Sequence, residues 1–310
     1  MNRFIIVSAS LLFVALMTSC NQVNKEGKSE ETFSVENMGR TISLDKNIKD
    51  VVVFDVGAME NMIELDIPFK GMAKQYAPNF LDSYIKDDKI TDVGYFIQPN
   101  YEQVSKLNPD LIIMSNWYDK DYSEFSKIAP TISVGIAGSD YMSSAIRDLK
   151  TLGQVFHVES KVDSLISQLE NKVTAVKETI ASSDETAMLI LYNNRNLSVF
   201  GKESRFGFIF KELGVKSAMG DIKEGSDHGS IVSSEFVMEQ NPDIIYIIDR
   251  GLVMDNTPLN KEELENPLIQ KTNAYKNGKI VYLDPNIWYL AGGGYTSFNK
   301  MLDGVLEAYN

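Results

Sequence analysis

The chain has 310 residues, and its 43 acidic side chains outnumber the 30 basic ones, for a net charge of −13 at pH 7. This balance argues against a nucleic-acid partner and against attraction to anionic lipid, because like charges repel. A single cysteine excludes an intramolecular disulfide and a cysteine-based metal centre. The length suffices for one or two sizeable hydrophobic cores.

The first residues predict export. Met1-Asn2-Arg3 precedes an apolar run from Phe4 to Met17 and the small residues Thr18 and Ser19, which is the order of a secretory signal. The apolar run is shorter than the roughly 20 residues that span a bilayer as a helix, so a permanent transmembrane anchor is not expected. We therefore expect residues 1–19 to be a signal peptide.

The only cysteine, Cys20, follows this signal directly, and Leu16 to Ser19 before it resemble the lipobox of bacterial lipoproteins. We expect Cys20 to carry lipid after cleavage, because an unpaired thiol is a liability in an exported protein. The alternative is a secretory signal that ends near a cysteine by coincidence. Residues 20–31 are polar, without apolar periodicity, and are predicted to be a flexible tether.

Two segments of the chain, Tyr101–Ile113 and Ser234–Tyr246, can be superimposed as sequence repeats. Each predicts a short helix, an Asn-Pro-Asp break and an apolar strand. The proline ends the helix because it disfavours helical geometry at the preceding asparagine. The apolar run suits a parallel strand that is buried on both faces. Their separation, nearly half of the exported chain, predicts two related α/β lobes.

Further apolar runs predict the strands 50–54, 131–134, 187–192 and 279–283. Between the lobes, apolar residues from Val162 to Ile180 have helical spacing, with Ser160 as the expected cap and Ser182 to Asp184 as the end. We therefore expect an α/β protein of two Rossmann-like lobes with central sheets, 32–159 and 183–310, joined by one long helix, 160–182. Ligands of open α/β folds bind at the carboxyl ends of the strands, so we expect the site in the cleft between the lobes.

Two arginines stand next to predicted strand ends. Arg205 follows a glycine-containing turn, and Arg250 ends the strand of the second repeat. An arginine there is costly unless paired, and Asp249 or a nearby acid is the structural alternative. Two arginines that face one cleft favour an anionic ligand held by planar donors. Arg147 and Arg195 are expected at the surface.

The chain has two histidines. His157 falls at a helix end, where a structural role is expected. His228 stands in a polar loop bounded by Gly225 and Gly229, just before the helix of the second repeat. An imidazole there suits a metal ligand or a hydrogen bond to an anion, and an ordinary loop histidine is the alternative.

Aromatic residues and three glycines follow the strand predicted at 279–283. The glycines let a helix begin near Tyr295 with open backbone donors. Tyr289 offers a phenol that, as phenolate, suits ferric ion. The alternative is that Trp288 and Tyr289 close the core. Gly-x-Ser-x-Gly, Walker and His-Glu-x-x-His patterns are missing, so no enzyme class is indicated and no intrinsic cofactor is expected.

From about Thr32 to its end the sequence resembles the substrate-binding lipoproteins of bacterial ABC importers for ferric siderophores, particularly the branch that binds catecholate ligands. The resemblance is carried by residues 54–58, 108–113, 200–207, 227–229 with 235–236, 241–250 and 282–291. It implies the class III periplasmic-binding-protein fold, two α/β lobes on one long helix, with a modest change of shape on binding.

The resemblance also implies residue roles. Arg205 and Arg250 match arginines that hold a trianionic ferric catecholate. His228 and Tyr289 match the residues that complete the six iron sites around a tetradentate siderophore, and Tyr295 stays open as the alternative tyrosine. Where the family presents a third arginine, this chain has Trp117, which can stack on a catechol but cannot neutralise its charge.

Members of this family dock on their permease through one exposed glutamate per lobe, which Glu235 and, less closely, Glu124 match; ordinary surface acids are the alternative. We therefore expect a monomeric receptor, lipid-anchored on the extracytoplasmic face, that delivers a ferric siderophore to an ABC permease with its ATPase. A haem or corrinoid receptor of the same fold and a lipid-anchored hydrolase that uses His228 are the alternatives.

Overall fold

The computed structural model describes residues 31–95, 97–138, 140–219 and 229–310. The expected signal peptide, Cys20, the tether up to residue 30 and His228 lie outside the described residues. Within the described ranges, none of the helices combines the length and the apolar character needed to cross a membrane.

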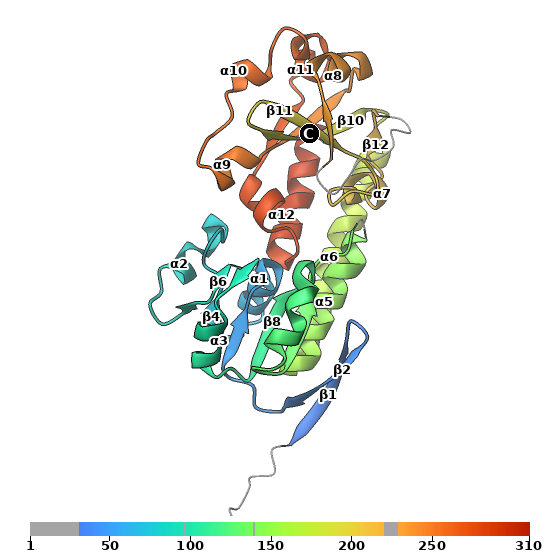
Figure 1. Cartoon of the computed structure of the whole chain (residues 1–310). Coiled ribbons are helices and arrows are strands. Elements are labelled where there is room, and N and C mark those ends of the chain that lie inside the picture. Colours follow the sequence, from blue (N-terminus) through green and yellow to red (C-terminus); the bar gives the residue numbers. More distant parts are fainter. Residues whose placement is uncertain (1–30, 96, 139, 220–228) are drawn as a thin grey trace, which may run out of the picture. The chain divides into compact units, whose positions relative to one another are not determined.

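The N-terminal lobe is built on a parallel five-stranded sheet (Figure 1). Its central strands β3 and β8 are fully buried, as an apolar strand covered on both faces requires. The strands expected near 50–54 and over 131–134 are confirmed as β3 and β9. The order across the sheet is β5 (Thr91–Asp92), β4 (Gly71–Met72), β3 (Val51–Val53), β8 (Leu111–Ser115) and β9 (Thr131–Val134).

Helices and two small hairpins surround this sheet. The hairpin β1–β2 is held to the sheet by Asn37, which exchanges hydrogen bonds with the backbone of Ser133. The elements are β1 (Thr32–Asn37), β2 (Arg40–Asp45), α1 (Val56–Glu64), η1 (Asn79–Leu81), α2 (Asp82–Ile85), β6 (Gly94–Tyr95), β7 (Gln98–Pro99), α3 (Tyr101–Leu107), η2 (Asn116–Asp121), α4 (Tyr122–Phe125) and α5 (Tyr141–Phe156).

The C-terminal lobe has a mixed six-stranded sheet in the order β13, β11, β10, β14 and β15, with β12 also paired to β10. The strands expected at 187–192 and 279–283 are confirmed as β10 and β15. The strands are β10 (Thr186–Asn193), β11 (Asn196–Phe200), β12 (Lys216–Ser217), β13 (Ser230–Val232), β14 (Ile244–Asp249) and β15 (Ile280–Leu283). The remaining elements are α7 (Phe208–Lys211), α8 (Ser234–Gln240), α9 (Arg250–Met254), α10 (Lys261–Leu264), η3 (Ile269–Lys271), α11 (Asn273–Lys276), the π-helical turn η4 (Asn286–Leu290), α12 (Tyr295–Leu306) and η5 (Glu307–Tyr309).

The sequence repeat is a structural repeat. Helices α3 and α8 both end at an asparagine in the left-handed conformation, Asn108 with φ 44° and Asn241 with φ 47°. Asparagine tolerates this conformation, which ends a helix as glycine does. The aspartate of each Asn-Pro-Asp break accepts a hydrogen bond from the backbone that leads into the neighbouring strand: Asp110 from Asp50, and Asp243 from Thr186.

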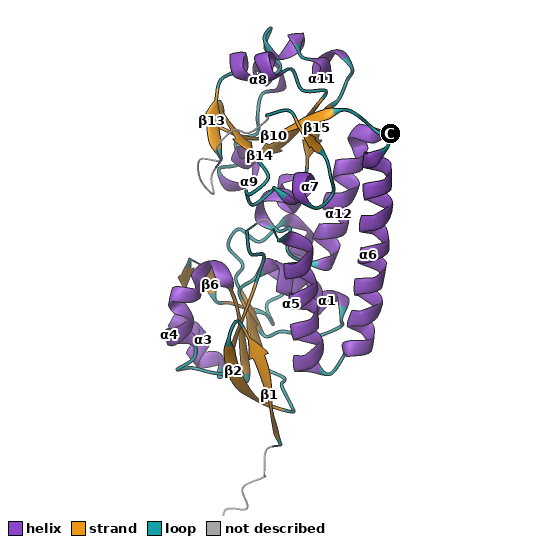
Figure 2. Ribbon diagram, turned by 90° about the vertical axis from the view of Figure 1, so that its right-hand side faces the viewer, coloured by secondary structure: helices purple, strands orange, loops and turns teal. Residues whose placement is uncertain are grey.

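A single helix, α6 (Glu159–Ala181), runs alongside both lobes (Figures 1 and 2). Its 23 residues extend about 35 Å at 1.5 Å per residue. The expected capping by Ser160 is wrong, because the helix begins one residue earlier, after Val158, without a side-chain cap. The chain passes directly from α5 into α6 through His157, which is left-handed and packs on the ring of Phe33 with 4.8 Å between ring centroids. His157 therefore has the structural role expected of it.

A second contact joins the lobes where α1 meets the start of α12. The amide of Tyr295 donates to Asn61 Oδ1 at 2.8 Å, and that of Ser297 donates to Glu60 Oε2 at 2.6 Å. The expectation of open backbone donors at this helix start is therefore wrong: side chains of the other lobe occupy them. The close approach depends on glycine, since a Cβ on Gly57 would lie 2.7 Å from the carbonyl carbon of Gly293.

Glu60 is buried in this contact and only 3% exposed. Burial is the main cause that raises its pKa to about 8, against the hydrogen bonds from Ser297. Its second carboxyl oxygen, Oε1, has no hydrogen-bond partner among the described residues. An ionisable group thus lies at the joint between the two lobes.

Candidate ligand-binding site

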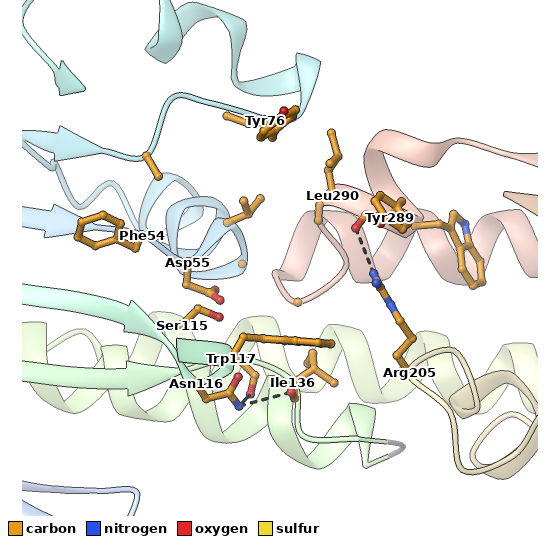
Figure 3. Close-up of a pocket in the computed structure, with 18 of the residues that line it drawn as sticks. Phe54, Asp55, Tyr76, Ser115, Asn116, Trp117, Ile136, Arg205, Tyr289 and Leu290 are labelled. Carbon is orange, nitrogen blue, oxygen red and sulfur yellow. Dashed lines mark hydrogen bonds between the residues drawn. The ribbon is translucent and has the colours of Figure 1, made fainter. Parts of the chain in front are cut away.

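A cavity of about 490 Å³ lies between the lobes, at the carboxyl ends of both sheets (Figure 3). Its position is the one expected for open α/β folds. In the N-terminal lobe, the cavity is lined by residues that directly follow strands β3, β8 and β9. The C-terminal lobe contributes the turn after β11 and the residues after β15. The main lining side chains are Asp55, Tyr76, Tyr95, Ser115, Asn116, Trp117, Glu203, Arg205, Phe206, Tyr289 and Leu290.

Arg205 is the cationic side chain of the described cavity lining. Its guanidinium lies over the rings of Phe206, Tyr289 and Trp117, at 4.6, 5.0 and 5.8 Å from their centroids. One of its nitrogens donates to the backbone oxygen of Tyr289 at 3.1 Å (Figure 3). Burial lowers the pKa of Arg205, because removal from water disfavours the charged form. Within the described ranges, no acid lies within ion-pair distance of it, so the structural alternative of an ion pair is not found there.

Arg250 does not line the described cavity, but it contacts the lining residue Tyr289. Its Nε donates to the Tyr289 hydroxyl at 2.8 Å, and its Nη1 lies 3.6 Å from Asp255 Oδ2. Asp249, the first partner that the sequence offered, instead accepts from the backbone of Leu252 as the cap of α9, and Asp255 is the nearby acid that the structural alternative named. Arg250 is therefore placed to orient the tyrosine ring and to add positive charge behind it.

Tyr289 and its neighbour Trp288 have different roles. Trp288 is 2% exposed and packs against Phe208 in the core of the C-terminal lobe, as the structural alternative held. Tyr289 lies in the same π-helical turn but lines the cavity. That turn follows β15 directly and presents the phenol at the end of the sheet.

Trp117 lines the cavity from the N-terminal lobe and is 56% exposed. It stands in η2, immediately after β8, and the neighbouring Asn116 ties this segment to the backbone oxygen of Gly135 at 3.0 Å. An exposed indole ring at a cavity offers a flat ligand a stacking surface.

Asp55 is the acidic group of the N-terminal wall. Its Oδ1 accepts from the amide of Ala58 at 2.9 Å and so caps α1. Burial raises the pKa of Asp55, which the hydrogen bonds from Ala58 and Ser115 only partly offset. Arg147, expected at the surface, is half-buried nearby, but its guanidinium donates to Asp148 and to the backbone oxygen of Gly135.

Two aromatic residues of this wall were missed by sequence reasoning. Tyr76 and Tyr95 pack together with 5.0 Å between ring centroids, and both line the cavity. Burial raises the pKa of Tyr95 to about 12, so its phenol is neutral at physiological pH. Tyr95 lies in a hairpin strand of two residues, which is too short to give a strand signal in the sequence. The glycine before it, Gly94, was a possible indication of a turn, and its φ of 93° agrees with one.

The remaining predicted residues lie elsewhere. Tyr295 does not line the described cavity, and its hydroxyl donates to Gln168 of α6 at 3.1 Å. The expectation that Tyr295 contacts a ligand is not supported by this position. Glu124 is exposed on α4 and paired with Lys127 at 2.6 Å. Glu235 is exposed in the first turn of α8, and the structural repeat places Glu102 at the equivalent position of α3.

The family model of periplasmic binding proteins matches residues 51–287. The chain is 36% identical to the petrobactin-binding protein YclQ of Bacillus subtilis over 316 residues, which cover 99% of each protein. It is 35% identical to the ferric-anguibactin-binding protein FatB of Vibrio anguillarum over 278 residues, 88% of this chain and 86% of the relative.

The solved structures agree. The siderophore-binding protein BauB, bound to a complex between two molecules of acinetobactin and ferric iron, is 37% identical with a TM-score of 0.83, and the match covers 90% of this chain and 99% of BauB. The crystal structure of YclQ gives 37% identity and a TM-score of 0.85, with the same coverage. These relatives are binding proteins rather than enzymes, which confirms the prediction from the missing catalytic patterns. The chain belongs to the family of periplasmic binding proteins.

Proposed function

We propose that this protein captures a ferric siderophore and delivers it to an ABC permease for iron uptake. The observation that carries the proposal is Arg205, a half-buried guanidinium at the cavity without a described acid in ion-pair distance. A cation that is partly removed from water in this way is costly until an anion approaches it. The names of the relatives support an iron chelate as that anion, over haem, a corrinoid or a hydrolase substrate.

The iron itself would arrive with the ligand. Tyr289 is our proposed protein ligand to ferric iron, because its phenol lines the cavity and a hard oxygen donor suits ferric ion. Arg250 would hold that ring through its 2.8 Å hydrogen bond. We keep His228, outside the described residues, as the proposed second ligand for a tetradentate siderophore.

The anchor and the docking surface are also proposals. Cys20 would carry the lipid that keeps a monomeric receptor beside its permease, on the extracytoplasmic face. For docking we propose Glu235 together with Glu102, in preference to Glu124. Glu102 and Glu235 occupy the same position in the first turn of repeated helices, whereas Glu124 lies outside the repeat. Ion pairing does not separate the two candidates of the first lobe, since Glu102 lies 2.7 Å from Lys106 and Glu124 lies 2.6 Å from Lys127.

Tryptophan-fluorescence titration tests the function. The lipid-free protein is titrated with the ferric complexes of petrobactin, anguibactin and acinetobactin, and with a tris-catecholate, a hydroxamate and haem. We expect at least one of the ferric complexes to bind with a Kd below about 10 µM, or roughly 7 kcal/mol. Binding of haem alone, or of none of these compounds, would overturn the proposal.

Docking is tested separately. Glu102→Lys and Glu235→Lys should leave the Kd for the ferric complex unchanged and should reduce ligand delivery to vesicles that contain the permease. Glu124→Lys is the matched control and should deliver as the wild type does. If only Glu124→Lys reduces delivery, Glu124 and not Glu102 is the docking residue of the N-terminal lobe.

A further inference from the structure

The two walls of the cavity differ in charge. The C-terminal wall holds Arg205 and also Glu203, whose carboxylate lies 3.3 Å from Lys211 Nζ. Arg205 stands on the side of the C-terminal lobe and Asp55 on the side of the N-terminal lobe, with Trp117 between them (Figure 3). Among the described lining residues, the N-terminal wall has no lysine or arginine. A ligand that is anionic over its whole surface would meet a carboxyl group on this side and gain no cation there.

The carboxyl group of Asp55 is hydrogen-bonded to neutral donors, and Arg147 attracts it only from beyond ion-pair distance. No basic side chain of the described chain lies within ion-pair distance of it. The nearest arginine, Arg147, is occupied by Asp148 and the backbone oxygen of Gly135. The partners of Asp55 are the backbone at the start of α1 and the Ser115 hydroxyl, which are neutral donors.

Asp55 and Arg205 are both partly removed from water. An unpaired carboxylate in such a position is costly in the same way as an unpaired guanidinium, and an approaching donor or cation relieves the cost. Charge-assisted hydrogen bonds from a protonated nitrogen to a carboxylate are short and about twice as strong as neutral ones. Asp55 and Arg205 together thus favour a ligand with two chemically different ends.

We propose that the transported chelate is bipolar, with anionic iron-binding oxygens facing Arg205 and a cationic or N–H-donating nitrogen, such as a protonated amine or imidazole, facing Asp55. This inference rests on the proposed function and narrows its substrate class. Trp117 fits the same division, since its ring stacks on the flat middle of the ligand and adds no charge.

The competing explanation is that Asp55 only caps α1. Asp55→Asn separates the two roles, because asparagine caps a helix about as well as aspartate but has no charge. Asp66→Asn is the matched control: Asp66 is exposed after α1 and away from the described cavity lining, and its substitution removes the same charge.

The experiment uses two ferric bis-catecholate complexes that differ at one linker position, a secondary amine in one and a methylene in the other. Their Kd values are measured at pH 7 for the wild type, Asp55→Asn and Asp66→Asn. We expect the wild type to bind the amine complex at least about tenfold more tightly, roughly 1.4 kcal/mol. Asp55→Asn should bring this ratio near one, mainly through weaker binding of the amine complex, and Asp66→Asn should keep it.

Equal binding of both complexes by the wild type would overturn the bipolar ligand and leave the proposed function intact. The same holds if Asp55→Asn keeps the preference or weakens both complexes equally, since a helix cap does not distinguish the two linkers. Thermal unfolding of the ligand-free variants reports whether the cap is retained. Binding of neither complex below about 10 µM, together with failure of the siderophore titration, would overturn the proposed function and this inference with it.

Discussion

The two lobes repeat one helix–turn–strand unit but end its strand differently. In the N-terminal lobe, β8 leads into Asn116 and the half-exposed ring of Trp117, whereas in the C-terminal lobe β14 leads through Asp249 into Arg250. The shared parts, the left-handed asparagine and the strand-binding aspartate, are hydrogen-bonded inside each lobe. Packing therefore fixes the scaffold, and the residue just beyond the strand differs in its role: Trp117 lines the cavity, whereas Arg250 holds the lining residue Tyr289 from behind.

The largest effect is expected when the positive charge of the C-terminal wall is removed. Arg205→Gln should weaken binding of a ferric siderophore at least about 100-fold, because truncating one side of a buried charge pair costs about 2–5 kcal/mol. Fluorescence titration measures this loss. Arg195→Gln is the control, since Arg195 is 78% exposed on its side chain and paired with Glu263. Equal, small effects of both substitutions would remove Arg205 from the binding site.

A second change tests the difference between the walls directly. Trp117→Ala should weaken binding about tenfold through lost stacking area. Trp117→Arg gives the N-terminal wall a cation and should raise affinity for a trianionic tris-catecholate complex relative to the wild type. Titration of both variants with that complex is the measurement. If Trp117→Arg binds it no better than Trp117→Ala, the wall charge does not select the ligand.

The next prediction concerns the iron ligand. Tyr289→Phe should shift the charge-transfer band of the bound ferric complex and weaken binding several-fold, because the substitution removes the proposed phenolate ligand. Absorption spectra of the saturated protein give the band. Tyr295→Phe is the matched control, because Tyr295 contacts Gln168 outside the described cavity lining. An unchanged spectrum with Tyr289→Phe would exclude Tyr289 as an iron ligand.

The smallest effect concerns the joint between the lobes. With a pKa raised from its ordinary 4.5 to about 8, Glu60 gains a proton on folding between these pH values, so its contribution to stability is full below about 4.5 and is lost as the pH rises toward 8. Glu60→Gln imitates the protonated form. Its melting temperature should equal that of the wild type near pH 5 and exceed it near pH 8.5.

Thermal scans across that range provide the measurement. Asp148, whose pKa burial raises to about 7, changes stability in the same direction, but it does so in both proteins and cancels in the difference. Parallel melting curves for wild type and Glu60→Gln at all pH values would contradict the assignment of the buried proton to Glu60.

Much of the fold was predictable because its signals are local. Apolar runs placed β3, β8, β9, β10, β14 and β15, and the spacing of Val162 to Ile180 gave the long helix within about one residue at each end. Trp117 and Tyr289 were found at the cavity because each follows a parallel strand, and the ends of parallel strands meet at one edge of a sheet. Arg205 follows the antiparallel strand β11, so its glycine-containing turn and its charge were the signals instead.

What the sequence did not reveal depends on contacts between distant segments. The donors at the start of α12 are occupied by Glu60 and Asn61, which are more than 230 residues away along the chain. The position of Tyr295 could not be predicted for the same reason, because its partners Asn61 and Gln168 are also distant along the chain. Glu102 is a different case, because the sequence repeat already aligned it with Glu235 and only the proposed docking role was not assigned to it.

Each sheet is continuous in sequence, β3 to β9 in one lobe and β10 to β15 in the other, with α6 between them. A gene fusion made within α6 would therefore keep every strand pair of both sheets. The contacts between the lobes would need to match between the parents, among them those of α1 with α12, of Asn79 with Asn286 and of Tyr141 with Glu212. Such a chain can inherit the two walls of its binding site from different ancestors. The ligand contacts of one lobe then change while those of the other lobe are kept.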